Sequence, residues 1–366
     1  MGLFQQPAST SESVTKTSTS IVARARLLDS PIAFTVFTGN MKSFFKSSIL
    51  LLLAVLFFGS AAIAADRVKA SYAAVNASQS PLWVAQDRGF FGKYGIEADL
   101  VFISSGSLNV QALVGNTVQF AAGGPAALEA RLRGPKLVTI ANPLTLLASN
   151  LVSHPDIKSI AELKGKVGAV SRFASSSHQG LRYLFRKNGL SETDLKLLQL
   201  GGDSGRLTGL ATGKVQYTFL GAAASEQARK QGLRVLATAE QMAIPFPWTS
   251  VVVHETWLES NRDLAYRYVK AVTEAVSFMK RNRPESERII SKYMKLNEPN
   301  LVSIEYNFNV ALFPDLPFPT LDGVRLILEN LATENPEHGR RDPKEFVDSS
   351  IVDQLKQEKF IESLVK

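Results

Sequence analysis

Hydrophobic and polar residues follow two periods along the chain, and the two alternate from Val68 onward. The segment VKASYAAV alternates apolar and polar positions, which is typical of a half-buried strand. A helix then begins at Pro81 and ends at Gly89, because proline is tolerated in a first helical turn and glycine commonly follows the last one. A second strand over 96–103, a helix that ends at Gly115 and a short strand in VQFAA complete this unit.

The same order of elements returns later in the chain. KVGAV predicts a strand, QGLRYLFRKNG a helix and LKLLQL a strand, and VQYTFL predicts another strand after a helix that ends at Gly213. The segments ALVGNTVQFAAG and GLATGKVQYTFLG are near repeats of each other. Two units that alternate strand and helix predict two α/β lobes of common plan, each with a parallel sheet.

Two long apolar segments connect the predicted lobes. They are LTLLASNLVSH (144–154) and WTSVVVHETW (248–257), and each leaves one unit and enters the other. We therefore expect a two-strand hinge beside a cleft, with a first lobe formed by 65–150 and 249–366 and a second formed by 151–248. The last third is mainly helical, and it carries an apolar stripe that we expect to pack on the first lobe. The stripe consists of Ala265, Tyr268, Val269, Val272, Ala275, Val276 and Met279.

The first 64 residues follow a different pattern. Residues 1–40 are polar and low in complexity, so we expect no packed structure there. From Met41, a basic stretch precedes an apolar run (49–58) and a small-x-small exit (62–64), which together are typical of a secretory signal peptide over 41–64. The run is too short for a membrane span, which takes about 20 residues. We interpret Met41 as the true start and expect export to the periplasm.

Composition narrows the chemistry that remains. The chain contains no cysteine, which excludes thiolate ligands, a cysteine nucleophile and lipid attachment through a cysteine. Its formal net charge of +8 suits an anionic ligand without requiring one. No basic run with interleaved aromatic residues indicates nucleic-acid binding. The histidines show no metal-binding spacing, so we expect neither a metal nor a cofactor.

Three segments of the chain resemble one known protein family. VAQDRGFFGKYGIEADLVFISSGSLNVQAL is similar to the opening of the nitrate, sulfonate and taurine substrate-binding proteins of bacterial ABC importers. IAELKGKVGAVSRFASSSH resembles that family's entry to its second lobe, and DPKEFVDSSIVDQL resembles its C-terminal helix. The resemblance covers nearly all of 66–355, although Gln119 and Gln216 stand where the family often has aspartate.

This resemblance carries expectations about fold, ligand and partner. It implies a periplasmic binding protein of type II, an α/β fold with two doubly wound lobes joined by a two-strand hinge. It also implies a small-molecule ligand, an ABC permease transmembrane subunit as partner, membrane contact only through that permease, and a monomer. A ligand-binding sensor module is an alternative. The thiamine-pyrimidine precursor synthases share the fold, but they use cysteines that this chain lacks, so we expect no enzyme.

Serine-rich and glycine-rich loops precede several predicted helices. In a doubly wound lobe, loops at the carboxyl ends of strands face the cleft. The stretch AVSRFASSSHQG lies at such a place, before a helix whose first-turn N–H groups are unpaired and favour an anion. Its serines cap the helix, bind the ligand, or do both. The expected ligand-binding residues are Gln79, Ser105, Gly106, Ser107, Gly123, Gly124, Arg172, Phe173, Ser175, Ser176, Ser177 and Trp248.

Several of these residues allow a second interpretation. Arg172 supplies either a bidentate clamp on a sulfonate or carboxylate, or a surface ion pair. The aromatic residues either line the cleft or pack elsewhere. A nucleophilic serine beside His178 is disfavoured, because sequence adjacency supplies neither an orienting acid nor an oxyanion hole. The GDSG turn is interpreted as a strand-to-helix loop that Asp203 or Ser204 caps.

Overall fold

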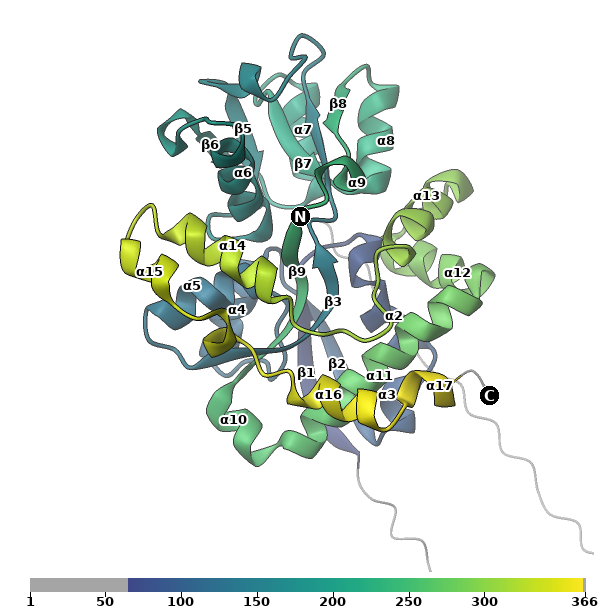
Figure 1. Ribbon diagram of the computed structural model, residues 1–366. Helices are drawn as coiled ribbons and strands as arrows, with labels where there is room; N and C mark the ends of the chain where they lie inside the picture. The colour runs from purple at the N-terminus through teal and green to yellow at the C-terminus, as the bar shows by residue number, and fades with distance from the viewer. Residues whose placement is uncertain (1–64, 365–366) are drawn as a thin grey trace, which may run out of the picture. The chain divides into compact units, whose positions relative to one another are not determined.

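The computed structural model describes residues 65–364, and its strands gather into two groups, each covered by helices (Figure 1). The segments 1–40 and 41–64, including the expected signal peptide, lie outside the described residues. The strands are β1 (Asp66–Tyr72), β2 (Ile96–Phe102), β3 (Leu137–Leu146), β4 (Asn150–Ser153), β5 (Val167–Val170), β6 (Lys196–Gln199), β7 (Tyr217–Leu220), β8 (Arg234–Ala237) and β9 (Pro245–His254).

The helices follow the strands in the alternation that the sequence predicts. Those before β9 are η1 (Ala77–Gln79), α2 (Ser80–Asp87), α3 (Phe90–Lys93), α4 (Gly106–Val114), α5 (Gly124–Leu132), η2 (Ala161–Leu163), α6 (Ser176–Lys187), η3 (Glu192–Asp194), α7 (Asp203–Ala211), α8 (Ala222–Lys230) and α9 (Ala239–Met242). Those after it are α10 (Glu255–Ser260), α11 (Arg262–Arg281), α12 (Arg283–Met294), α13 (Pro299–Val310), α14 (Leu321–Leu331), α15 (Pro336–Arg340), η4 (Pro343–Phe346), α16 (Ser350–Gln357) and α17 (Phe360–Ser363).

The first group of strands contains β1, β2, β3 and β9. β1 and β2 pair in parallel, and β3 and β9 pair antiparallel. Two isolated bridges, Ala70 to Phe120 and Ala121 to Val252, connect the two pairs. The strand predicted in VQFAA is therefore reduced to two bridging residues, Phe120 to β1 and Ala121 to β9.

The second group forms one sheet with the order β6-β5-β7-β4-β8. β5 pairs in parallel with β6 and β7, as predicted, but β4 runs antiparallel to both β7 and β8. The prediction of a purely parallel sheet is therefore wrong for this strand. β4 enters the sheet directly from β3, so it runs away from the first group, whereas β5 and β7 run toward it.

The two crossings between the groups lie side by side. The chain leaves β3 for β4 through 147–149, and it returns from α9 to β9 through 243–244. The Leu147 N–H donates to the Ile244 carbonyl at 3.0 Å, which joins the two crossings. The apolar runs expected as a two-strand hinge are thus divided, with paired strands on the first-lobe side and short unpaired crossings beyond them (Figure 1).

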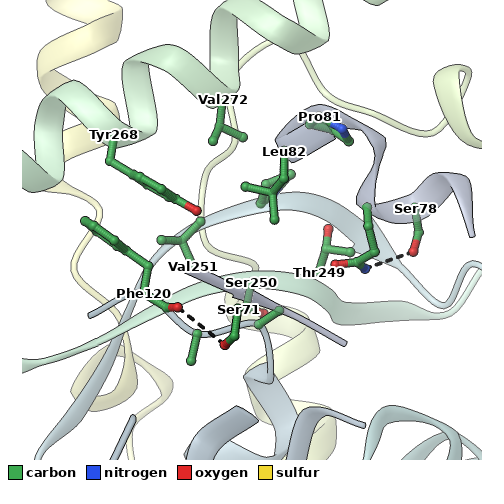
Figure 2. Close-up of a pocket in the computed structure, with 14 residues that line it drawn as sticks. Ser71, Ser78, Pro81, Leu82, Phe120, Thr249, Ser250, Val251, Tyr268 and Val272 are labelled. Carbon is green, nitrogen blue, oxygen red and sulfur yellow. Dashed lines mark hydrogen bonds between the residues drawn. The ribbon is translucent and has the colours of Figure 1, made fainter. Parts of the chain in front are cut away.

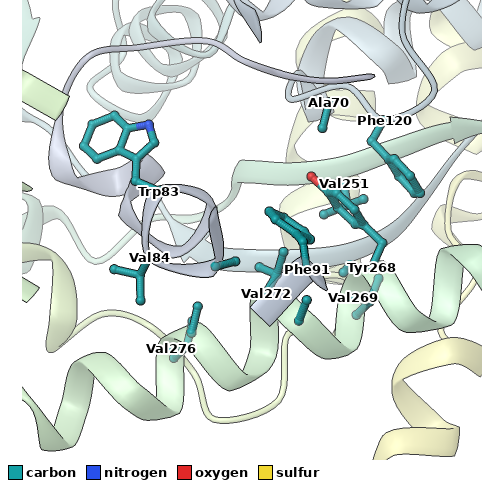
Figure 3. Packing of buried hydrophobic residues seen from close by; sticks show 14 of the residues in the cluster. Ala70, Trp83, Val84, Phe91, Phe120, Val251, Tyr268, Val269, Val272 and Val276 are labelled. Atoms are coloured by element: carbon teal, nitrogen blue, oxygen red, sulfur yellow. The ribbon is translucent and has the colours of Figure 1, made fainter. Parts of the chain in front are cut away.

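The main hydrophobic core lies where α11 packs near the first group of strands. All seven residues of the predicted α11 stripe are buried, which confirms that prediction. Tyr268 stacks on Phe120 with ring centroids 3.8 Å apart and an interplanar angle of 6°. Phe91 also stacks on Tyr268, with ring centroids 5.2 Å apart (Figure 3). Each such buried side chain contributes roughly 1.5–3 kcal/mol relative to an exposed one.

A second core cluster joins α14 to the other lobe. Val324 and Ile327 of α14 belong to the same buried cluster as Leu181 and Phe185 of α6. The buried Arg182 of α6 reinforces this contact, because its guanidinium donates to the Asn330 carbonyl at 2.8 Å and pairs with Glu334 at 2.9 Å. The C-terminal segment therefore packs on both lobes.

Two features are absent from residues 65–364. No helix in this range is long and apolar enough to cross a membrane. No group of three or more histidine, aspartate or glutamate side chains within the described range is arranged to hold a metal ion.

Gly168 of β5 offers a test of the second sheet. A β-carbon at this position would overlap the Tyr217 ring of β7, which is fully buried. Gly168→Ala should lower the free energy of unfolding by about 2 kcal/mol in urea denaturation, as overpacking in a core does. Gly92→Ala is the matched control, because open space surrounds Gly92 and alanine is the better helix former. An equal effect of both substitutions would contradict the packing described here.

Candidate ligand-binding site

A cavity of about 640 Å³ lies between loops of the two lobes. Its walls come from the segments that follow β1, β2, β5, β6 and β7, together with Trp248 and three residues of the C-terminal helical region. The carboxyl ends of strands from both sheets thus face a common space, as expected for doubly wound lobes. The volume falls within the range of about 300–1,000 Å³ that is usual for small-molecule pockets.

The structure brings together seven of the twelve residues expected from the sequence. The cavity-lining residues among them are Gln79, Ser105, Gly106, Ser175, Ser176, Ser177 and Trp248. The other five lie elsewhere: Ser107, Gly123, Gly124, Arg172 and Phe173 do not line the cavity.

The two glycines outside the cavity allow close packing instead. A β-carbon on Gly123 would lie 2.6 Å from the Gly106 carbonyl oxygen, so the two loops could not approach with any larger residue there. A β-carbon on Gly124 would collide with the Ser250 hydroxyl. Ser107 lies in the first turn of α4, where its hydroxyl bonds to that of Ser105 at 2.8 Å.

Arg172 and Phe173 are on the outer surface of the second lobe. The loop turns outward here because Ala174 has a φ of 62° and the Ser175 hydroxyl donates to the Arg172 carbonyl at 2.6 Å. The Phe173 ring is 49% exposed and packs edge-on against His178 at 5.2 Å. The loop therefore brings the serines beyond Phe173 to the cavity wall, but not the Arg172 and Phe173 side chains.

The serine cluster at the start of α6 is held by its own hydrogen bonds. The Ser177 hydroxyl accepts the Ser171 N–H at 2.9 Å and bonds to the Ser175 hydroxyl at 3.0 Å. Ser175 is the N-cap residue, but its side chain makes no capping bond. The first-turn N–H groups of α6, which have no partner within a helix, therefore lie beside the cavity without a serine cap.

His178 is not arranged to activate a serine. Its Nδ1 accepts the Ala174 N–H at 3.1 Å, so this nitrogen serves the loop backbone. Burial, together with the nearby Arg182, lowers the pKa of His178 to about 4. The imidazole is therefore neutral at pH 7, and it supports the turn rather than a nucleophile.

Asp203 and Arg206 form the charged part of the cavity wall, which the sequence analysis treated only as a turn. Gly202 is the N-cap of α7 and Asp203 lies in its first turn, so neither Asp203 nor Ser204 caps it from outside. The Asp203 carboxylate pairs with Arg206 and accepts the Gly221 N–H at 3.0 Å. Arg206 also donates to the Gly201 carbonyl at 2.5 Å and to the Phe219 carbonyl at 3.1 Å.

Asn76 and Glu305 complete the polar wall. The Asn76 side chain donates to Asp203 across the lobes at 3.4 Å. Glu305 of α13 is only 1% exposed, and burial together with the negative charge of Asp203 raises its pKa to about 7 against the opposing effect of two backbone N–H bonds. Its position directly after a predicted strand makes Asn76 a cleft candidate from the sequence, whereas nothing near Glu305 in the sequence indicates a cleft residue.

A second cavity, of about 20 Å³, is much smaller (Figure 2). Ser78 and Gln79 line both, and the Gln79 side chain donates to the Ser78 hydroxyl at 3.0 Å. The Thr249 hydroxyl lines the small cavity and has no hydrogen-bond partner within residues 65–364. The space suffices for one water molecule, which takes about 10–15 Å³ by this measure.

The charges around the large cavity are compensated inside the protein. Arg206 is the one basic residue among those described that line it, and its guanidinium is bonded to Asp203 and to two carbonyl groups. The groups that remain for a ligand are therefore hydroxyls, side-chain amides and backbone N–H groups, with apolar surface from residues such as Phe102 and Trp248.

The family model described as NMT1/THI5 like matches residues 76–286. The chain belongs to the NMT1/THI5-like family. A putative binding protein of Brucella abortus (strain 2308) is 26% identical over 280 residues, which cover 74% of this chain and 85% of that protein. The family resemblance inferred from the sequence is thus confirmed.

Solved structures of this NMT1/THI5-like chain's neighbours show the same fold. The periplasmic aliphatic sulphonate binding protein SsuA from Escherichia coli matches with a TM-score of 0.63 and 19% identity, covering 78% of this chain and 92% of that one. The periplasmic nitrate-binding protein NrtA from Synechocystis PCC 6803 matches with a TM-score of 0.62 and 13% identity, covering 80% and 89%. The periplasmic binding protein fold expected from the sequence is confirmed.

The Asp203–Arg206 pair allows a stability test. Arg206 is 6% exposed, so Asp203→Asn would leave a buried guanidinium without its counter-charge. We expect the free energy of unfolding to fall by about 3 kcal/mol in urea denaturation. Glu226→Gln removes the half-buried i,i+3 partner of the exposed Arg229 on the adjacent α8 and should cost about 0.5 kcal/mol or less. Similar costs for the two variants would show that Asp203 is not a buried partner.

His178 should make the protein less stable in mild acid. Its folded pKa of about 4 lies below the ordinary 6.5, so the unfolded chain binds a proton first as the pH falls. The free energy of unfolding should therefore drop between pH 6.5 and 4, by at most about 1.4 kcal/mol per pH unit from this group. His178→Asn should flatten this part of the profile, and His154→Asn, at a side chain that is 41% exposed, is the surface control. An unchanged slope in His178→Asn would refute the assignment.

Proposed function

We propose that this chain is an extracytoplasmic solute-binding protein that captures a small organic anion between its lobes and delivers it to an ABC permease. The observation that carries the proposal is the cavity of about 640 Å³, into which strand ends and helix starts of both lobes converge. The names of the similar proteins, which concern aliphatic sulphonate and nitrate, support an anionic ligand. We also propose a signal peptide over 41–64, a periplasmic location and a monomer.

The cavity wall favours an anion held by neutral donors. α4 and α6 begin at the cavity with Ser105 and Ser175 as their N-cap residues, and a helix N-terminus favours negative charge by roughly 0.3–1 kcal/mol. The Arg206 guanidinium is already paired, so the ligand's charge is matched by hydroxyls and N–H groups rather than by a salt bridge.

The size of the cavity and its apolar surface favour an organic ligand over a bare inorganic ion. Phe102 is 45% exposed at the cavity wall, and Trp248, Met294 and Leu296 add further apolar surface. Such surface would leave a hydrated inorganic anion in poor contact, whereas it would gain roughly 25 cal/mol for each Å² of apolar ligand that it covers. We therefore infer a ligand with an acidic head and an apolar body, such as an alkanesulfonate or an aromatic acid.

Capture would work by closure of the lobes. A ligand that touches loops of both lobes binds the closed form better than the open one, and it shifts the equilibrium by that difference in affinity. The crossings at 147–149 and 243–244 are the places where the backbone could rotate while β3 and β9 stay paired. A sensor that signals to another partner would use the same closure, and the genetic neighbourhood of a permease would distinguish the two.

Ser176 provides a sharp test of the ligand site. Its side chain lines the cavity, and its hydroxyl has no hydrogen-bonding partner among residues 65–364, so Ser176→Ala should leave stability nearly unchanged. We expect a thermal-shift screen of residues 65–366 with alkanesulfonates, taurine, nitrate, aromatic carboxylates and pyrimidines to give a hit among the organic anions. At 100 times its Kd the ligand adds about 2.7 kcal/mol of stability.

The same substitution then tests whether the ligand is held at the cavity by the Ser176 hydroxyl or only attracted by the charge of the whole protein. Ser176→Ala should weaken the hit by about tenfold, the loss expected for one hydrogen bond to a charged group. Ser191→Ala, at an exposed turn of the second lobe, should bind as the wild type does. Hits confined to neutral pyrimidines would refute the anionic class, and silence across the whole panel would refute the proposed function.

A further inference from the structure

Glu305 of α13 lies between the two walls of the cavity. α13 packs against α12, which packs in turn on α2 of the first lobe, and it also contacts α8 of the second. The Glu305 side chain is almost completely buried and belongs to the cavity wall. A buried carboxylate is costly unless it is hydrogen-bonded, so its partners indicate why it is there.

The two oxygens of Glu305 bond to different lobes. Oε2 accepts the N–H of Ala77, the first residue of η1, at 2.9 Å. Oε1 accepts the N–H of Ala223, in the first turn of α8, at 2.8 Å. Asn309, one turn further along α13, donates to Oε2 at 3.2 Å and holds the carboxylate in place.

Both N–H groups belong to segments that form the ligand site. The segment that begins at Ala77 leads into Ser78 and Gln79, and α8 presents Ala223, Ala224 and Gln227 to the cavity. First-turn N–H groups have no partner within their own helix, and a buried one left unpaired costs about 1–3 kcal/mol. Glu305 therefore satisfies one such donor from each wall at once.

We propose that Glu305 is a positioning residue that joins the two walls of the ligand cavity and makes lobe closure depend on its carboxyl group. The proposal rests on the proposed function, because it concerns the same cavity. By satisfying Ala77 and Ala223 from one side chain, Glu305 stabilises the arrangement in which η1 and α8 face each other. Opening the lobes would break the Ala223 bond and admit water to the carboxylate.

The protonation of Glu305 should follow the same movement. Burial and the negative charge of Asp203 together raise its pKa to about 7, although the bonds from Ala223 and Ala77 oppose the rise. In an open form the carboxyl would return toward its ordinary pKa near 4.5. The closed form then holds a proton that the open form releases, so raising the pH from 4.5 to 7 favours opening, by up to tenfold per pH unit.

Few other charges bear on Glu305. Asp203 acts on it directly, and Asp203 is in turn paired with Arg206. η1 contributes no titratable side chain. The charged groups of α8 and α12 are paired: Glu226 with Arg229, Lys230 with Glu298, Arg283 with Glu287, Arg288 with Glu285 and Asp87, and Lys292 with Asp87. At the end of α11, Lys280 pairs with Asp315, and Arg281 donates to the Ser277 and Leu364 carbonyls.

Amide hydrogen exchange tests, without any ligand, whether Glu305 holds the Ala77 and Ala223 N–H groups together. In the wild type at pH 5.5, where the closed form is favoured, the Ala77 and Ala223 amides should be protected, and Glu305→Ala should speed exchange at both by at least tenfold. Glu305→Gln keeps one acceptor and replaces the other with a donor, so at least one of the two amides should lose protection. Glu298→Gln is the matched control, since Glu298 precedes the same helix and pairs with the same α8 through Lys230, but is 61% exposed. It should change neither amide.

The pH dependence of the radius of gyration is a measurement that a purely structural role of Glu305 would not change. Small-angle scattering of the ligand-free wild type should show a larger radius of gyration at pH 8 than at pH 5.5, and Glu305→Gln should remove the difference. Fast exchange at Ala223 in the wild type at pH 5.5, or an unchanged pH response in Glu305→Gln, would overturn the proposal. If Glu305→Ala fails to fold, the wild-type pH series and Glu305→Gln still decide.

The two proposals can fail separately. The protein could bind nothing in the ligand screen while protection of Ala223 still depends on Glu305. This outcome would uphold the role of Glu305 and refute the proposed function. Binding of ethanesulfonate, used as the probe, with equal affinity in wild type and Glu305→Ala would uphold the function and refute the role of Glu305. We expect the affinity of Glu305→Ala for this probe to be at least tenfold weaker.

Discussion

The antiparallel pair of β3 and β9 is the connection on which the ligand cavity depends. Both strands are almost entirely buried in the first lobe, and each leads within a few residues into the second. Because their ladder bonds are buried, breaking them would be costly, so relative movement of the lobes is restricted to the short crossings beyond the strands. The bond between Leu147 and Ile244 makes these crossings adjacent, which gives the lobes a common axis rather than two independent tethers.

Around this axis, contacts on two sides hold the lobes in the arrangement described. On one side Asn76, Glu305 and Asp203 meet at the cavity. On another, α14 packs on α6, and Arg182 fixes that contact through bonds to Asn330 and Glu334. The contact between α14 and α6 contains a buried guanidinium and an apolar cluster, whereas the contact at the cavity consists of a few polar hydrogen bonds. Separation of the lobes at the cavity would therefore disturb less buried apolar surface than separation at α14.

The charged side chains around the cavity are matched by partners within the protein. Asp203 and Arg206 neutralise each other, and Glu305 is matched by two backbone N–H groups and has its pKa raised by burial. A fixed positive charge would bind anions of any shape strongly and release them slowly. Neutral donors such as Ser105 and Ser176 distinguish ligands by geometry, which suits a protein that must release what it captures.

Much of the fold followed from periodicity alone. Strand and helix periods, with Pro81 and Gly89 as start and stop signals, predicted the alternation of elements, and the α11 stripe predicted the core around Tyr268. These features are local, because a residue's face in a helix or strand depends on its near neighbours in the chain. For the same reason, the loops at strand ends indicated Ser105 and Ser175 to Ser177 as cavity residues.

The tertiary structure decided everything that depends on distant partners. The direction of β4 depends on where the chain enters the second sheet, and the outward turn that removes Arg172 from the cavity depends on the backbone of Ala174. Glu305 lies 228 residues from Ala77 and 82 from Ala223, so no local pattern could indicate their contact. The sequence by itself determined most of the elements, and it indicated that the loops after β1, β2 and β5 face the cleft. Only the folded chain determined which charges meet there, because burial and pairing arise between segments that the sequence keeps far apart.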